Sequence, residues 1–169
     1  MLKRLTVLLA LAGLGAIATA APRDRQSASS AIRPDFSGTW EVVSLTNTPP
    51  GEYRTYMWTP PVKMTQDAKT LILEYVSGGR NHAPVKLVYN LDGSEGKGVD
   101  RNGPSPYDLL IRAEWRSARL ALNTIYLREK QGNIETSEIL RLDSPSTMTV
   151  ETTWKLGDLT RTSISTWRR

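Results

Sequence analysis

The stretch YDLLIRAEWRSARLALNTIYL, residues 107–127, contains two strands and the turn between them. In its first half, apolar residues such as Leu109 and Ile111 alternate with polar or charged residues. The second half, residues 120–127, returns after the polar segment 116–119. A period of two is typical of a β-strand with one buried face, so this stretch predicts an antiparallel hairpin.

Similar segments, separated by turn residues, extend in both directions from this hairpin. The remaining strands are expected at residues 38–45, 62–66, 70–76, 84–91, 134–142, 147–154 and 159–167. Segment 92–106 is rich in Gly, Asp, Ser and Pro, and it is expected to be irregular. No helical period interrupts the series, which predicts an all-β domain over residues 35–169.

A single antiparallel meander of about eight to ten strands would expose two unpaired edges if it stayed flat. Closing the sheet into a barrel removes those edges. A two-sheet sandwich is the competing all-β arrangement. We therefore expect a barrel, which at this size either holds one small ligand or is filled by its own side chains.

Residues 1–20 have the three parts of a bacterial export signal. Lys3 and Arg4 precede an uncharged apolar run, and Ala18-Thr19-Ala20 supplies small residues for cleavage. The run is shorter than the roughly 20 residues of a membrane-spanning helix. The polar segment 21–34 is expected to be a flexible leader. The sequence thus predicts a periplasmic or secreted protein that is not inserted in the membrane after cleavage.

The charge distribution argues against nucleic acid as a partner. The formal net charge is +5, and the two cations of the signal account for part of it. Lys and Arg are otherwise interspersed with Asp and Glu along the expected strands. Charged residues at the outward positions Arg112, Glu114 and Arg161 also argue against an outer-membrane barrel, whose outward face is apolar.

The triplet Gly38-Thr39-Trp40 on the first strand, followed by a meander, resembles the calycin group of lipocalins and lipocalin-like exported barrels. In that group, a Gly-x-Trp motif lies at the closed end of the barrel, and a basic residue from the end of the last strand packs across the Trp. The resemblance implies that Gly38, Trp40 and either Arg168 or Arg169 close this barrel. It also implies a lipocalin-like fold.

The chain is also similar to a set of bacterial exported proteins of uncharacterised function. Their shared features are a Phe-Ser-Gly-x-Trp opening, two turns and an aromatic-Arg-Arg ending. The corresponding segments are Phe36-Ser37-Gly38-Thr39-Trp40, Gln66-Asp67, Leu91-Asp92-Gly93 and Trp167-Arg168-Arg169.

No residue pattern indicates a reaction centre, a cofactor or a metal site. His82 is the only histidine and there is no cysteine, so a zinc site would need flanking carboxylates that the sequence lacks. The glycine-rich segment 92–98 lacks the spacing of a phosphate loop. Asp108 and Glu114 would be about 20 Å apart along one strand, too far for a glycosidase pair. We therefore expect a non-enzymatic protein.

The best candidate for a binding surface lies between the pairs Pro49-Pro50 and Pro60-Pro61. It contains Tyr53, Tyr56 and Trp58, and aromatic loop residues are common at contact surfaces. They could instead fold back and plug the barrel.

Two functions are open on these grounds. The first is a binding protein that takes a small apolar or amphipathic ligand in the barrel, with inward hydroxyls expected from Thr152, Thr162 and Thr166. The alternative is a protein-interaction module, such as a periplasmic protease inhibitor or a partner of another envelope protein, acting through the arm 21–34.

Overall fold

The computed structural model describes residues 33–50, 57–78, 82–100, 107–128 and 132–169. These residues form ten antiparallel strands. In chain order the strands are β1 (Gly38–Thr48), β2 (Val62–Gln66), β3 (Thr70–Val76), β4 (Pro84–Asn90), β5 (Gly96–Asp100), β6 (Tyr107–Arg116), β7 (Arg119–Leu127), β8 (Ile134–Ser144), β9 (Thr147–Leu156) and β10 (Leu159–Arg168). Each strand pairs with the next along the chain except β4 with β5, and β1 also pairs with β10.

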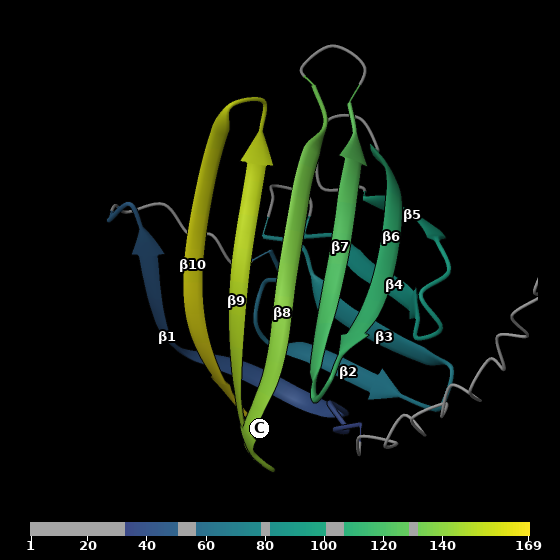
Figure 1. The fold of residues 1–169 in the computed structure, drawn as a ribbon, viewed down its shortest axis with the longest axis vertical. Coiled ribbons are helices and arrows are strands. Elements are labelled where there is room, and N and C mark those ends of the chain that lie inside the picture. The colour runs from purple at the N-terminus through teal and green to yellow at the C-terminus, as the bar shows by residue number, and fades with distance from the viewer. Residues whose placement is uncertain (1–32, 51–56, 79–81, 101–106, 129–131) are drawn as a thin grey trace, which may run out of the picture.

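Strand β1 joins two layers of this sheet. Its first residues, Gly38 to Trp40, pair with β2, whereas its later residues pair with β10. A break in register between Val42 and Ser44 separates the two parts. Bulges of this kind bend a strand and increase its twist. Figure 1 shows the result, with β2, β3 and β4 lying behind β6 to β10 and running obliquely to them.

The ends of the strand order, β4 and β5, come together and nearly close the barrel. No ladder joins them in the described part of the chain. The contact is nevertheless close, because a Cβ built on Gly96 would lie 3.3 Å from the Val88 carbonyl oxygen and 3.1 Å from Ile111 Cγ1. Glycine at this position lets the backbone of β5 approach β4 without a side chain between them.

The two ends of the barrel differ in their connections. The short turns at Asp67–Lys69, Ser117–Ala118 and Pro145–Ser146 lie at one end, together with the start of β1 and the end of β10; we call this the closed end. The described strand ends that border the four internal gaps, such as Leu127 of β7 and Ile134 of β8, lie at the other end, which we call the loop end.

The core fills the space between the two layers. Its largest fully buried side chains are Trp40, Trp167, Tyr89, Phe36, Met64, Leu71, Leu73, Leu87, Leu109, Ile111, Leu120 and Leu122. Burying a Trp or Phe side chain removes about 150–250 Å² from water, so these residues dominate the stability of the barrel.

The predicted fold class, an all-β antiparallel meander, is confirmed. The nine expected strands are present, with ends that differ by at most three residues. The expectation that segment 92–106 is irregular was wrong in part, because it contains β5. None of the described segments forms a helix that could cross a membrane.

Candidate functional site

The closed end is held by an arginine at the very end of the chain. The guanidinium carbon of Arg169 lies 4.8 Å from the ring centroid of Trp40. Arg169 Nη1 donates a hydrogen bond to the Ser37 carbonyl oxygen, and Arg169 Nε donates one to the Pro145 carbonyl oxygen at 2.7 Å. The guanidinium therefore connects the start of β1 to the β8–β9 turn across the face of an indole ring.

Gly38 provides the space for this arginine. Its φ is +140°, and a Cβ built on it would lie only 2.6 Å from Arg169 Cδ. Of the two terminal arginines that the sequence suggested, Arg169 is the one over Trp40. Arg168 is exposed and pairs with Glu41 in the β1–β10 ladder.

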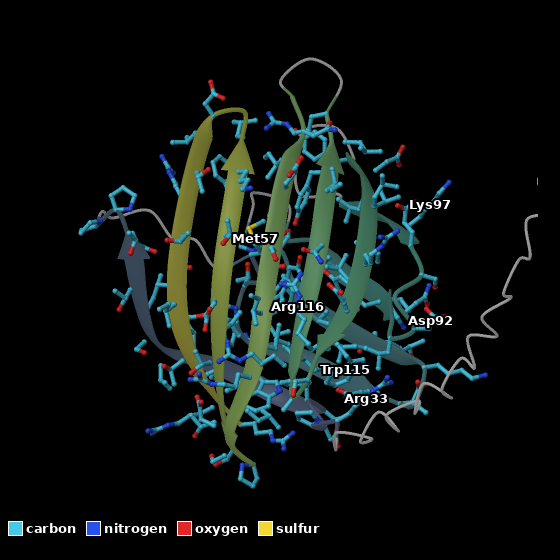
Figure 2. All side chains as sticks on the ribbon, viewed as in Figure 1. Arg33, Met57, Asp92, Lys97, Trp115 and Arg116 are labelled. Atoms are coloured by element: carbon cyan, nitrogen blue, oxygen red, sulfur yellow. The ribbon has the colours of Figure 1, made fainter. Side chains whose placement is uncertain are left out.

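The residues before β1 cover the closed end. Phe36 stacks on Trp115 with ring centroids 6.3 Å apart, and the guanidinium of Arg33 lies 5.3 Å from the same indole (Figure 2). The Gln66 side chain accepts a hydrogen bond from the Phe36 amide and donates one to the Pro34 carbonyl oxygen. The end of the predicted leader is thus attached to the barrel from Arg33 onward.

The aromatic loop is described only in part. Tyr53 and Tyr56 lie outside the described residues. Trp58 is 2 % exposed and packs against Trp167, with ring centroids 6.0 Å apart. Met57 also packs against the core (Figure 2). The described part of this segment, Met57 and Trp58, therefore belongs to the core.

Polar side chains occupy the barrel interior toward the loop end. On β8, β9 and β10 the ladder register places Glu138 opposite Thr152, and Thr152 opposite Ser163. All three are buried. One step nearer the loop end, Thr136 on β8 lies opposite Thr124 on β7, and both are buried.

Two of the three threonines expected in the interior lie elsewhere. Thr152 is buried as expected, but the inward positions of β10 are Ser163 and Ser165. Thr162 and Thr166 therefore lie on the outward face of the strand, because successive side chains alternate between faces. Arg161, which was expected to be outward, shares the inward phase of Ser163, and its guanidinium lies 5.7 Å from the Trp154 ring centroid. The burial of Trp167 fixes this alternation.

Glu138 is the most unusual group in the interior. It is 1 % exposed, and among the described residues it is the only buried side chain that is acidic or basic. Neither of its carboxylate oxygens has a hydrogen-bond partner of normal geometry within the described chain, and neither does the Thr136 hydroxyl beside it. A buried polar group without a partner costs free energy, and a buried charge costs more.

Burial raises the pKa of Glu138 from 4.5 to about 8, and the Thr136 hydroxyl and the Glu138 backbone oppose this increase less strongly. Glu138 therefore carries a proton in most molecules at neutral pH.

A tyrosine faces this carboxyl group from the opposite layer. Tyr89 on β4 is fully buried, and its hydroxyl is 2.8 Å from Thr124 Oγ1. Burial raises the pKa of Tyr89 well above 10, and the nearby Glu138 raises it further. Tyr89 therefore remains a neutral hydroxyl. We call Tyr89, Thr124, Thr136, Glu138 and Thr152 the Glu138 cluster.

The chemistry available to this cluster is recognition. A carboxyl group with both oxygens unpartnered, with the hydroxyl-bearing Thr136 and Thr152 at neighbouring inward positions, can accept several hydrogen bonds from one small polar or cationic group. The described residues contain no group of three or more His, Cys, Asp or Glu side chains that could hold a metal ion.

Sequence reasoning did not identify Glu138. The sequence does contain an indication of its burial. Glu138 lies an even number of positions from Leu140 and from Leu142, so the three side chains are on the same face of the strand. A charged residue on the face of a strand that otherwise carries apolar residues indicates a buried charge.

Away from the Glu138 cluster, a concave region lies on the outer face of β2, β3 and β4, with a volume of about 670 Å³. Its lining includes Pro60, Pro61 and His82, and an ion-paired group of Lys63, Glu74 and Lys86. His82 is exposed with a φ of +42°, which is typical of a turn residue.

No protein-family model matches the sequence, and no curated protein matches it.

Proposed function

We propose that the protein is a non-enzymatic binding protein that takes a small amphipathic ligand in the loop-end half of its barrel. The observation that carries this proposal is the Glu138 cluster. A barrel of this size can be filled entirely with apolar side chains, which stabilise it better than hydroxyls and an unpartnered carboxyl group.

Groups that cost stability in this way are concentrated at functional sites. A ligand that satisfied the oxygens of Glu138 would recover hydrogen bonds that the described protein leaves unmade. Toward the loop end, the partly buried Trp154 opposite Thr136 and the buried Tyr126 opposite Ile134 offer aromatic surface, and the guanidinium of Arg161 lies 5.7 Å from the Trp154 ring centroid. A ligand with a polar end and an apolar body suits this combination.

The proposal includes export and a lipocalin-like relationship. Residues 1–20 have the pattern of a signal, and the Gly38, Trp40 and Arg169 arrangement at the closed end has the form that the resemblance implied. The alternative function, interaction through the arm 21–34, depends on residues of which 21–32 lie outside the described chain.

Native mass spectrometry tests the binding function. The mature protein would be purified from the periplasm of its own host without removal of lipids. A reproducible non-covalent adduct of a few hundred daltons is the expected result. A bare monomer mass under conditions that keep a control lipid carrier loaded would contradict the proposal.

A further inference from the structure

We propose that Glu138 is the counter-charge for a cationic ligand, an amphipathic primary amine whose ammonium group binds within the Glu138 cluster. This inference rests on the proposed binding function and specifies the chemical class of the ligand.

The position of Glu138 favours a ligand that enters with its polar group first. Along β8, its inward neighbours are Thr136 toward the loop end and Leu140 toward the closed end. Across the ladders, its partners are Leu122 on β7 and Thr152 on β9. Glu138 thus lies at the boundary between the apolar core and the polar interior. On β8 it is the buried polar residue nearest the closed end.

The surrounding groups match the donors of an ammonium ion. An ammonium group has three N–H donors and no acceptor. The Glu138 cluster provides two carboxylate oxygens and the hydroxyl oxygen of Thr136, none of which has a hydrogen-bond partner of normal geometry in the described residues. An anionic ligand would instead place a second negative charge beside Glu138, which low-dielectric surroundings make costly. In this proposal the apolar body of the ligand points toward the loop end, where Tyr126 and Trp154 lie at inward positions.

The number of protons released on ligand binding depends on the titratable and charged groups around Glu138. Its ladder partners Leu122 and Thr152 do not titrate, and Tyr89 from β4 stays neutral. The charged side chain at the inward phase of β10 is Arg161, which lies one position nearer the loop end than Ser163, with its guanidinium 5.7 Å from the Trp154 ring centroid. Binding of an ammonium ion favours the ionised carboxylate. The protonated carboxyl group therefore loses its proton to solvent, and the product is a carboxylate–ammonium pair. Each binding event at neutral pH releases up to one proton, and the affinity rises with pH until Glu138 is already ionised.

Three probes with the same chain test the charge preference: n-octylammonium, n-octanol and octanoate. Binding to the full mature protein would be measured by isothermal titration calorimetry in two buffers of different ionisation enthalpy, which gives the number of protons released. We expect octylammonium to bind at least about tenfold more tightly than octanol, as for a hydrogen bond to a charged group. Octanoate should bind least well.

Two variants of the same strand separate the role of Glu138 from a general effect of charge. Glu138→Gln keeps the shape of the side chain and removes the charge. Glu135→Gln makes the same change on the exposed outward face of β8. We expect Glu138→Gln to abolish both the preference for octylammonium and the proton release, and Glu135→Gln to retain both. Circular dichroism would establish that both variants are folded.

Three results would overturn the inference. These are equal binding of octanol and octylammonium, an unchanged preference in Glu138→Gln, and binding of none of the three probes to the wild-type protein. Equal binding leaves the proposed binding function intact and rejects only the cationic class. The binding function itself fails separately, on a bare mass for the protein isolated from its host.

Discussion

Replacing Glu138 by glutamine should make the stability of the protein less dependent on pH. Glu138 is fully enclosed by the barrel, and burial raises its pKa from 4.5 to about 8. In the unfolded chain the same group ionises near its ordinary pKa. The unfolded state therefore loses this proton at lower pH than the folded state, and folding becomes less favourable as the pH rises between the two values. Below about pH 4.5 the effect disappears, because both states hold the proton.

The size of this loss of stability follows from the interval between the two pKa values of Glu138, 4.5 and about 8. The folding equilibrium constant should fall by nearly tenfold for each pH unit within it. Between pH 5 and pH 8 this amounts to a loss of about 3 to 4 kcal/mol in the free energy of unfolding. Such a loss is a large fraction of the stability of an ordinary domain, about 5 to 15 kcal/mol.

The assay is urea unfolding, followed by tryptophan fluorescence, at a series of pH values for three proteins. The free energy of unfolding of the wild type should fall across the series relative to that of Glu138→Gln. The exposed-site variant Glu135→Gln should follow the wild type. Parallel curves for the wild type and Glu138→Gln would refute the reasoning, because they would mean that the carboxyl group titrates alike in the folded and unfolded states.

Three further predictions concern the barrel itself. Arg169→Ala should lower the free energy of unfolding by about 2 kcal/mol, through loss of the contact with Trp40 and of hydrogen bonds to backbone carbonyls. Arg168→Ala is the matched control and should change it by less than about 0.5 kcal/mol when both variants are compared by thermal unfolding; equal losses would count against closure by Arg169. Gly96→Ala should destabilise by about 1 kcal/mol, because its Cβ would press on the β4 backbone, whereas Gly98→Ala would make ordinary contacts at 3.6 Å and beyond. If the two glycine variants melt alike, the close approach of β5 to β4 is not required. Trp58→Ala should cost about 3 to 5 kcal/mol in denaturant unfolding, as expected of a core indole; a loss below 1 kcal/mol would indicate that the ring is not part of the core.

The alternation of side chains made most of the strands predictable, because each has one buried and one exposed face. Strand β5, Gly96–Asp100, escaped prediction for a physical reason. Its glycines remove the side chains that would have shown a period of two, and they are there because β5 packs closely on β4 and β6. A strand whose inward positions are glycines shows no alternation of apolar and polar side chains, so the sequence does not identify it.

The interior was predictable only where a bulky residue fixed the phase of a strand. On β10, Ile164 and Trp167 lie at opposite phases, so alternation alone did not decide which face is inward. The structure buries Trp167 and leaves Ile164 56 % exposed. The larger apolar surface is the one that is buried, and this places Ser163 and Ser165 inward in place of Thr162 and Thr166.

The Glu138 cluster could not be assembled from the sequence, because its members come from four strands. Tyr89 on β4 reaches Thr124 on β7 across the two layers. That contact depends on the bend in β1, which turns one layer obliquely to the other. The sequence shows that Glu138 is on the apolar face of its strand, but it does not show which side chains of other strands lie opposite it.

The most direct test of a ligand site around Glu138 is a comparison of native masses. The wild type, Glu138→Gln and Glu135→Gln would be purified side by side from the periplasm of the same host without delipidation. A site built around Glu138 predicts the same adduct on the wild type and Glu135→Gln, and its loss from Glu138→Gln. A bare mass for all three proteins, or an adduct of equal occupancy on all three, would contradict it.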